Sequence, residues 1–220
     1  QKVIMVTSSQ PGEGKSFITA NLATSLAYLG NKVIVVGMDI RKPGLNRAFG
    51  FDKKQYGVSN YLNDPDGTKL EDYIFTSEFS ENLHILPGGT VPPNPTELVA
   101  RTTLDKMIEI LKEKYDYVML DSAPIGMVAD SAIIGRVADM CIYVCRSEVT
   151  PKAAFSYINV LNDQNKFNKL AVVINDVDYQ KRKSRYGYGY GYGYGYGYGY
   201  GYGYGYGYGY GYENSKKKKK

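Results

Sequence analysis

Apolar residues in the first 180 positions follow two alternating patterns: short β-branched runs, and longer stretches with helical spacing. The short runs predict strands at 3–6, 33–36, 83–86, 117–120, 140–144 and 170–174. The longer stretches predict helices at 15–29, 97–114 and 149–160, and Gly30 is a stop signal for the first helix. Strands that alternate with helices are typical of βαβ units. We therefore predict an α/β fold with a mostly parallel sheet flanked by helices.

The last forty residues have a different pattern. Tyrosine alternates with glycine from Tyr186 to Tyr212, and five lysines close the chain. A Tyr-Gly repeat offers no apolar stripe that could be buried, and glycine at every second position opposes backbone order. We predict a folded domain over residues 1–180 and a flexible, disordered C-terminal tail over residues 181–220.

The charge of the chain is divided between these two parts. Residues 1–180 carry 18 basic and 21 acidic side chains, a net charge of −3, whereas residues 181–220 carry nine basic side chains and Glu213, a net charge of +8. A mildly acidic folded part argues against nucleic acid as a partner.

Three further observations limit the class of protein. The two cysteines, Cys141 and Cys145, lie in one predicted strand about 13 Å apart, too far for a disulfide, so we expect both to be buried packing residues. No apolar run reaches the ~18 residues that a membrane span requires. Because the chain begins at Gln1 with its first strand almost at once, we expect it to be a fragment of a longer protein.

A candidate phosphate-binding loop, SQPGEGKS, occupies residues 9–16, after the first strand and at the start of the first helix. Gly12 and Gly14 allow a tight turn whose amides point at phosphates, Lys15 reaches the β- and γ-phosphates, and Ser16 binds Mg²⁺. The residues predicted to contact ATP in this segment are Gln10, Pro11, Gly12, Glu13, Gly14, Lys15, Ser16 and Phe17. The alternative is an ordinary glycine-rich turn between a strand and a helix.

Polar residues end three more of the predicted strands. Asp121 ends an apolar strand as a Walker B aspartate does, and Asp39 follows the second strand, so we predict that both help to hold Mg²⁺ and are catalytic together with Lys15. Asn175 ends the last strand, where its amide could contact an adenine edge. The alternative is an ordinary aspartate or asparagine in a loop.

These segments together resemble the cytoplasmic domain of the bacterial tyrosine kinases (BY-kinases) that control capsule and exopolysaccharide export. The resemblance lies in TSSQPGEGKS, in DIRKP, in the loop PGGTVPPNPTEL at 87–98, in LDSAP at 120–124, in VVINDV at 172–177 and in the tyrosine-rich end. The related partition ATPases have a lysine early in the phosphate loop, where this chain has Gln10.

The resemblance implies a P-loop NTPase-like fold and an ATP- and Mg²⁺-dependent tyrosine autokinase that acts in trans within a homo-oligomeric ring. The implied partners are a membrane-embedded co-polymerase segment or activator and a protein tyrosine phosphatase, and the implied location is the cytoplasmic side of the bacterial inner membrane. The implied phosphate acceptors are the tail tyrosines Tyr186, Tyr188, Tyr190, Tyr192, Tyr194, Tyr196, Tyr198, Tyr200, Tyr202, Tyr204, Tyr206, Tyr208, Tyr210 and Tyr212.

One position departs from the family pattern. The second motif of the family has two acids, D-x-D, and this chain has Gly37 in place of the first and Asp39 as the second. We expect a Gly37→Asp change to keep or raise activity. Two other functions stay open: an ATPase switch of the partition type, and a nucleotide-binding scaffold whose aromatic tail only binds partners.

Overall fold

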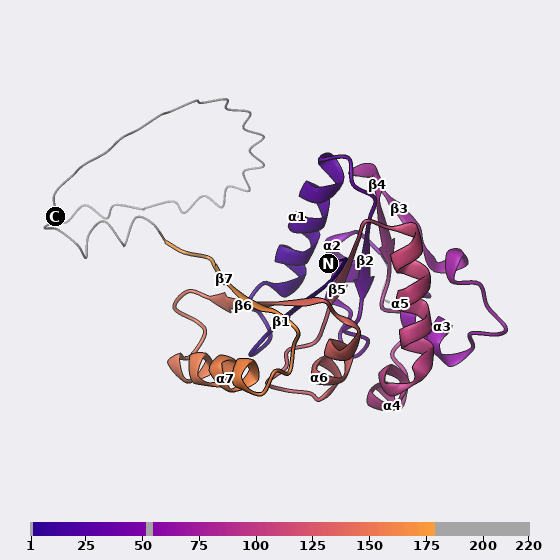
Figure 1. Ribbon diagram of the computed structural model, residues 1–220. Coiled ribbons are helices and arrows are strands. Elements are labelled where there is room, and N and C mark those ends of the chain that lie inside the picture. The colour runs from indigo at the N-terminus through magenta and orange to yellow at the C-terminus, as the bar shows by residue number, and fades with distance from the viewer. Residues whose placement is uncertain (1, 52–54, 179–220) are drawn as a thin grey trace, which may run out of the picture. The chain divides into compact units, whose positions relative to one another are not determined.

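A seven-stranded sheet forms the centre of the computed structural model, which describes residues 2–51 and 55–178 (Figure 1). Its strands are β1 (Val3–Ser8), β2 (Val33–Gly37), β3 (Phe75–Ser77), β4 (Ser80–Leu86), β5 (Tyr117–Asp121), β6 (Met140–Arg146) and β7 (Leu170–Asn175). The strand order is β3-β4-β2-β5-β1-β6-β7, and every neighbouring pair is parallel except β3 with β4. The predicted α/β class and its mostly parallel sheet are confirmed.

All six predicted strands are present, each slightly longer than its apolar run. The seventh, β3, is a three-residue strand that pairs with β4 through a tight hairpin and shifts register between Thr76 and Ser77. Its sequence has too few residues to show a period, so the pattern of apolar positions could not predict it.

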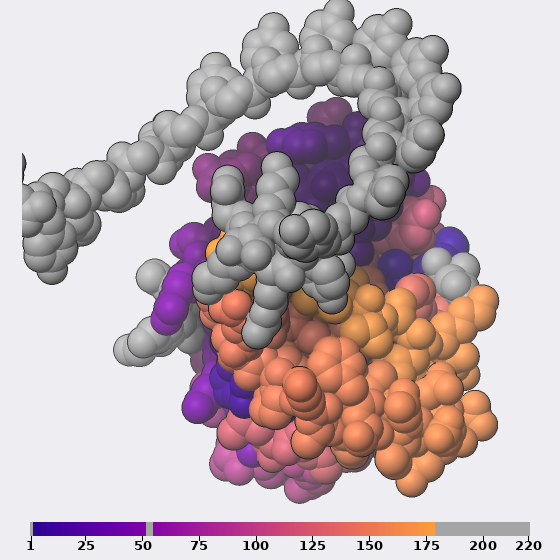
Figure 2. Space-filling view, turned by 90° about the vertical axis from the view of Figure 1, so that its left-hand side faces the viewer, coloured from indigo at the N-terminus to yellow at the C-terminus, as the bar shows by residue number. Residues whose placement is uncertain are grey.

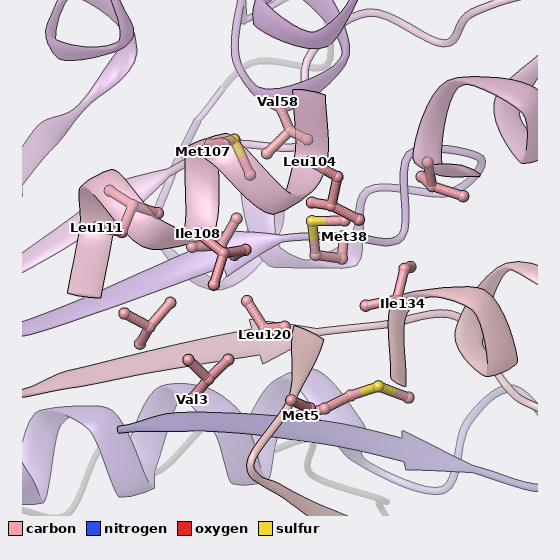
Figure 3. Close-up of a cluster of buried hydrophobic side chains, with 14 of the residues drawn as sticks. Val3, Met5, Met38, Val58, Leu104, Met107, Ile108, Leu111, Leu120 and Ile134 are labelled. Carbon is pink, nitrogen blue, oxygen red and sulfur yellow. The ribbon is translucent and has the colours of Figure 1, made fainter. Parts of the chain in front are cut away.

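Helices cover both faces of the sheet. On one face lie α1 (Lys15–Tyr28) and the short α2 (Gly44–Ala48), and on the other lie α4 (Pro95–Ala100), α5 (Thr102–Lys114) and α7 (Lys152–Asp163). Figure 3 shows the second face, where Leu104, Met107 and Ile108 of α5 point toward side chains of the central strands. Both faces of the central strands are buried, which explains why these strands read as continuous apolar runs.

Helix α1 packs against the sheet through small residues. Its buried positions are Lys15 and the small residues Thr19, Ala23 and Ala27, spaced four apart, whereas Phe17 stays exposed. Small side chains let the helix lie close to the strands, so the first turn of α1 is held directly above the carboxyl ends of the strands. The predicted stop is also confirmed, because α1 ends at Tyr28 and Gly30 has a positive φ of 87°.

The prediction of one helix over 97–114 is wrong. The segment forms α4 and α5, which are separated at Arg101, whose ψ of 150° is extended. The break is stabilised by Arg136, whose guanidinium donates to the carbonyls of Val99 and Arg101 and to the carboxylate of Asp105. The partner that satisfies the end of α4 comes from far along the chain, so local spacing could not reveal the break.

The remaining elements are short: α3 (Val58–Asn63), the 3₁₀ turn at Leu70–Tyr73, α6 (Asp130–Ile134) and a 3₁₀ turn at Gly135–Val137. The predicted third helix begins at Lys152 and not at 149, because Pro151 precedes its first turn. Cys141 and Cys145 are free and buried, as expected.

The segment from β6 to β7 closes one side of the molecule. Figure 2 shows it in orange, forming most of the surface on that side. Among the described residues, no helix is both long and apolar enough to cross a bilayer. The predicted tail, with its fourteen tyrosines and the boundary at residue 180, lies outside the described residues and stays a prediction.

The joint between α4 and α5 gives the first testable prediction. Replacing Arg136 with Gln removes the charged donor that satisfies three backbone carbonyls, those of Val99, Arg101 and Ile133, so we expect the free energy of unfolding to fall by about 2 kcal/mol. Urea denaturation measures this change. The matched control is Arg101→Gln, which removes only an exposed ion pair with Glu97 and should cost less than about 1 kcal/mol. Equal losses in the two variants would contradict a special role for Arg136.

Candidate active site

The loop at residues 9–16 has the backbone geometry that a phosphate-binding loop requires. It connects β1 to α1, and Gly12 and Gly14 have φ values of 83° and 99°, a region that side chains disfavour. Gly14 is required for a second reason, because a Cβ there would lie 2.2 Å from the amide nitrogen of Asn175. The end of β7 therefore packs directly on the loop, and this contact brings Asn175 into the site.

Glu13 holds the loop together from inside. Its buried carboxylate accepts hydrogen bonds from the Ser9 hydroxyl at 2.8 Å, from the Gln10 amide at 2.8 Å and from the Thr150 hydroxyl. The sequence predicts Glu13 as an ATP contact. In the structure its side chain points inward, so its backbone amide is the group that remains for a phosphate.

A second set of contacts braces the loop from the strand ends beside it. Arg146 donates to the carbonyl of Gly12 at 3.1 Å and forms an ion pair with Asp176 at 2.9 Å. The Asn175 amide donates to the carbonyl of Glu13 at 3.1 Å. The sequence analysis missed Arg146 and Thr150, although their position after a strand on the ligand side of the sheet was a usable signal.

Lys15 and Ser16 open α1 where the loop ends. Burial lowers the pKa of Lys15, and the nearby carboxylates of Asp121 and Asp39 oppose that shift. A buried cation that faces acids is poised to receive a more highly charged anion such as a triphosphate. The Ser16 hydroxyl donates to Oδ2 of Asp121 at 2.7 Å, so the loop and the end of β5 are in direct contact.

Asp121 is a buried acid at the end of β5. Its backbone carbonyl accepts the amides of Met38 and Asp39 at 2.8 and 3.0 Å, which fixes the end of β2 beside the end of β5. Its Oδ1 is buried and has no hydrogen-bond partner in the described part of the chain. Burial raises the pKa of Asp121 to about 6, although Ser16 and Lys15 act in the opposite direction.

These groups fit a magnesium ion. Ser16 at the start of α1, Asp39 in the loop after β2 and Asp121 at the end of β5 supply hard oxygen donors. The Oδ1 of Asp121 has no hydrogen-bond partner among the described residues. Within the described residues, no three His, Cys, Asp or Glu side chains gather into a metal site. Magnesium commonly binds through one or two carboxylates plus substrate phosphates, so the donor set suits that ion together with a nucleotide.

Asp39 is positioned by the backbone around it. Its Oδ1 accepts the amide of Lys42 at 3.0 Å. Burial raises the pKa of Asp39, and the hydrogen bond from Lys42 and the charge of Lys15 oppose that increase. The structure thus brings all three predicted catalytic residues together at one edge of the sheet.

Gly37 lies where the chain has no room for a side chain. A Cβ at this position would lie 2.7 Å from the backbone nitrogen of Gly88, and Gly88 in turn lies against the carbonyl of Gly37. The expectation that Gly37→Asp keeps or raises activity is therefore at odds with the packing. The missing acid reflects the close approach of the 87–90 loop, a contact that the sequence pattern could not show.

A partly buried ion pair joins the loop after β2 to two helices beside the site. Arg41 donates to Asp130 at 2.7 Å and to Thr96 at 2.7 Å, and Thr96 donates to Asp130 at 2.7 Å. The pair links the loop after β2 to α4 and α6, so it holds the segment that carries Asp39. The sequence analysis quoted Arg41 only as part of a motif and missed this role.

The other predicted contacts lie around the loop. Gln10 donates its side-chain amide to the carbonyl of Val149, and Pro11 and Phe17 are exposed, with 62% of Phe17 accessible. The structure thus gathers every predicted ATP contact around one loop. His84 of β4 packs edge-on against Tyr115.

Comparison with known proteins gives consistent results. The AAA domain family matches residues 1–158. The chain is 30% identical to a putative tyrosine-protein kinase CapB of Staphylococcus aureus over 83% of this chain and 78% of that protein. It is 38% identical to the tyrosine-protein kinase CpsD of Streptococcus pneumoniae over 58% of this chain, and the match spans about half of that relative, 55%.

Solved structures include similar kinase domains. The kinase domain of VpsO superposes with a TM-score of 0.73 and 32% identity, over 81% of this chain and 86% of that one. The sequence similarity and the fold thus point to the same group of proteins.

The contact between Gly37 and Gly88 gives the second prediction. Gly37→Ala should lower the free energy of unfolding by about 1–3 kcal/mol, because the added methyl group meets backbone and not a flexible side chain. Gly37→Asp should lower it further, since a carboxylate is also buried there. Urea denaturation and hydrogen exchange at residues 87–90 would measure the two effects. A Gly37→Asp protein as stable as the parent would show that the loop can move aside.

The buried carboxylate of Asp121 gives the third prediction. Its pKa is raised in the folded state from 3.8 to about 6, so folding favours the protonated form. The protonated carboxyl group of Asp121 stabilises the folded state fully below pH 4, and this contribution is lost as the pH rises to 6. At pH 7 the loss is on the order of 2–3 kcal/mol. Asp121→Asn should therefore raise the melting temperature in EDTA above pH 6, by about 5 °C or more.

Asp139 provides the matched control for Asp121. Burial alone would raise the pKa of Asp139, but the amides of Val3 and Lys2 lower it overall. Asp139→Asn should therefore destabilise the protein at neutral pH, the opposite sign. Thermal unfolding between pH 4.5 and 8 compares the variants with the parent. A lower melting temperature for Asp121→Asn at pH 7.5 would contradict the assignment of Asp121 as a strained, metal-binding acid.

Proposed function

The chain belongs to the bacterial tyrosine-protein kinases within the AAA domain family, and we propose that it transfers the γ-phosphoryl group of ATP to tyrosine, chiefly in the tail of a second copy. One observation carries the proposal. A phosphate loop with a buried lysine and an unpartnered Asp121 oxygen occurs in a chain that ends in fourteen regularly spaced tyrosines.

Different residues of the site have different roles in the proposed phosphoryl transfer. The loop amides and Lys15 would hold the phosphates, and Ser16, Asp39 and Asp121 would hold Mg²⁺, which would neutralise negative charge on the phosphates. The tyrosine oxygen forms a bond to the γ-phosphorus while the bond to the β–γ bridging oxygen breaks, and ADP leaves. The phenol proton passes to water, since a loose transition state needs little help from a base.

The tail suits the role of substrate by its length and charge. The segment from Tyr179 to Tyr212, treated as a flexible coil, spans about 30 Å on average, enough to reach a neighbouring copy. The tail carries +8 and the rest of the chain −3, so the two attract one another. The acceptors are the even-numbered tyrosines from Tyr186 to Tyr212.

The names of the relatives support a proposal for the partners and the setting. One relative, in Klebsiella pneumoniae, is named as a putative tyrosine-protein kinase in a cps region, and others are named CapB and CpsD. We place the activity in the control of capsular or exopolysaccharide synthesis and export, in a homo-oligomeric ring at the cytoplasmic side of the inner membrane. A co-polymerase segment or activator would stimulate the ring, and a tyrosine phosphatase would reset it.

The packing at Gly37 supports a second candidate function. Because the first acid of the motif is absent and the 87–90 loop occupies its place, a nucleotide-binding scaffold with an aromatic interaction tail is also compatible with the site. Hydrolysis of ATP without phosphorylation would indicate a partition-type switch. Incubation with Mg-ATP separates these functions, because only the kinase forms phosphotyrosine.

The fourth prediction tests the kinase directly. Lys15→Met removes the cation that faces the phosphates, so we expect phosphotyrosine in the tail to fall by a factor of about 100 or more. Phosphotyrosine mapping by mass spectrometry after incubation with Mg-ATP measures the loss. The matched control is Lys32→Met, which replaces an exposed lysine at the opposite end of β2 and should leave the rate unchanged. Unchanged phosphotyrosine in folded Lys15→Met protein would contradict the proposal.

A further inference from the structure

A basic groove lies beside the catalytic acids and has no role in the transfer described above. It has a volume of about 660 Å³ and is lined by the loop after β2, by α2 and by Val91 of the 87–98 loop. Three cations, Arg41, Lys42 and Arg47, line it, and none of the described residues that line it is acidic. The groove is therefore built for an anion.

The same groove also offers an apolar surface. Phe51, Pro43 and Val91 contribute to its lining, and Val91 is 61% exposed. Apolar and aromatic walls combined with several cations suit a ligand that joins a flat ring to a doubly charged phosphate. Phosphotyrosine has this composition. Inorganic phosphate lacks the ring and would use only the cations.

The groove shares a wall with the catalytic site. Gly44, which lines the groove, packs against the Ser16 hydroxyl, since a Cβ on Gly44 would lie 3.2 Å from that oxygen. The backbone amide of Lys42 donates to Asp39. A ligand in the groove is thus a near neighbour of a tyrosine at the site of transfer.

The repeat in the tail matches this arrangement. In an extended chain, side chains two residues apart project from the same face, about 6.6 Å apart along the backbone. Every tyrosine from Tyr186 to Tyr212 is two residues from the next, so a stretch of the tail bound in an extended conformation would present its tyrosines on one face. A modified tyrosine held in the groove would present the next unmodified tyrosine along the same wall.

We propose that the groove lined by Arg41, Lys42 and Arg47 binds phosphotyrosine of the Tyr-Gly tail and so makes phosphorylation of the repeat sequential. The proposal rests on the proposed kinase function. Lys42 and Arg47 make no ion pair within the described residues, so both are available for a phosphate, whereas Arg41 is shared with Asp130. The first phosphate on a tail would then speed the addition of the next.

The binding experiment uses the full dephosphorylated chain with Lys15→Met, in EDTA, so that no turnover occurs. Two labelled Tyr-Gly peptides of equal length, one with a single phosphotyrosine, are titrated and followed by fluorescence anisotropy. We expect the phosphopeptide to bind about tenfold or more tightly than the plain peptide, and Lys42→Gln with Arg47→Gln to abolish the difference. The control pair is Lys69→Gln with Lys106→Gln, two exposed lysines outside the groove, which should preserve the difference.

The kinetic experiment uses the active chain. A peptide with phosphotyrosine two residues from its acceptor should be phosphorylated faster than the plain peptide, and the Lys42→Gln, Arg47→Gln chain should lose that advantage while keeping its rate on the plain peptide. A chain that binds the phosphopeptide but forms no phosphotyrosine would refute the proposed kinase function and still support phosphotyrosine binding in the groove. Equal binding of both peptides would overturn the groove proposal, as would equal competition by inorganic phosphate and free phosphotyrosine. Binding only to vesicles containing phosphatidylserine would also overturn it and assign the groove to a membrane.

Discussion

One residue at the end of β5 joins the parts on which the site depends. The backbone carbonyl of Asp121 takes two amides from the end of β2, and its carboxylate takes the hydroxyl of Ser16 at the start of α1. Adjacent parallel strands place these groups at one edge of the sheet, and the hydrogen bonds of Asp121 then fix their distances. The buried core beneath the strands keeps this edge rigid, so the carboxylate stays buried although it lacks a full set of partners.

The same arrangement places groups suited to ligand binding where they lower the stability of the folded protein. A buried carboxylate with an unpartnered oxygen lowers the stability of the empty protein, and a buried lysine that faces it adds a second desolvated charge. In the proposed function, a bound nucleotide and its metal would satisfy both groups. Glu13, Arg146 and Asn175 hold the phosphate loop in shape before that happens, so binding does not have to order the loop.

Much of the fold and most of the site could be read from the sequence. The strands at 33–37 and 117–121 are continuous apolar runs because both of their faces are covered, and the loop at 9–16 combines required glycines with a helix start. The break at Arg101 could not be predicted, because the group that stabilises it comes from a distant part of the chain. The position of Arg146 at the end of a strand indicated that it lies on the ligand side of the sheet, but the sequence did not show its contact with Gly12. The order of the strands in the sheet also could not be predicted from the local pattern of apolar residues, because it depends on the crossover connections.

The close approach of Gly37 and Gly88 has a consequence for how this sequence can change. A side chain at 37 requires the backbone at Gly88 to withdraw, and one at 88 presses on the carbonyl of Gly37, so the two positions are epistatic. An acid at 37 becomes acceptable only after the 87–90 loop has shifted. If the acid is introduced first, the intermediate protein is less stable. Mutational paths that restore a second acid are therefore ordered, with changes in the loop preceding the change in the strand.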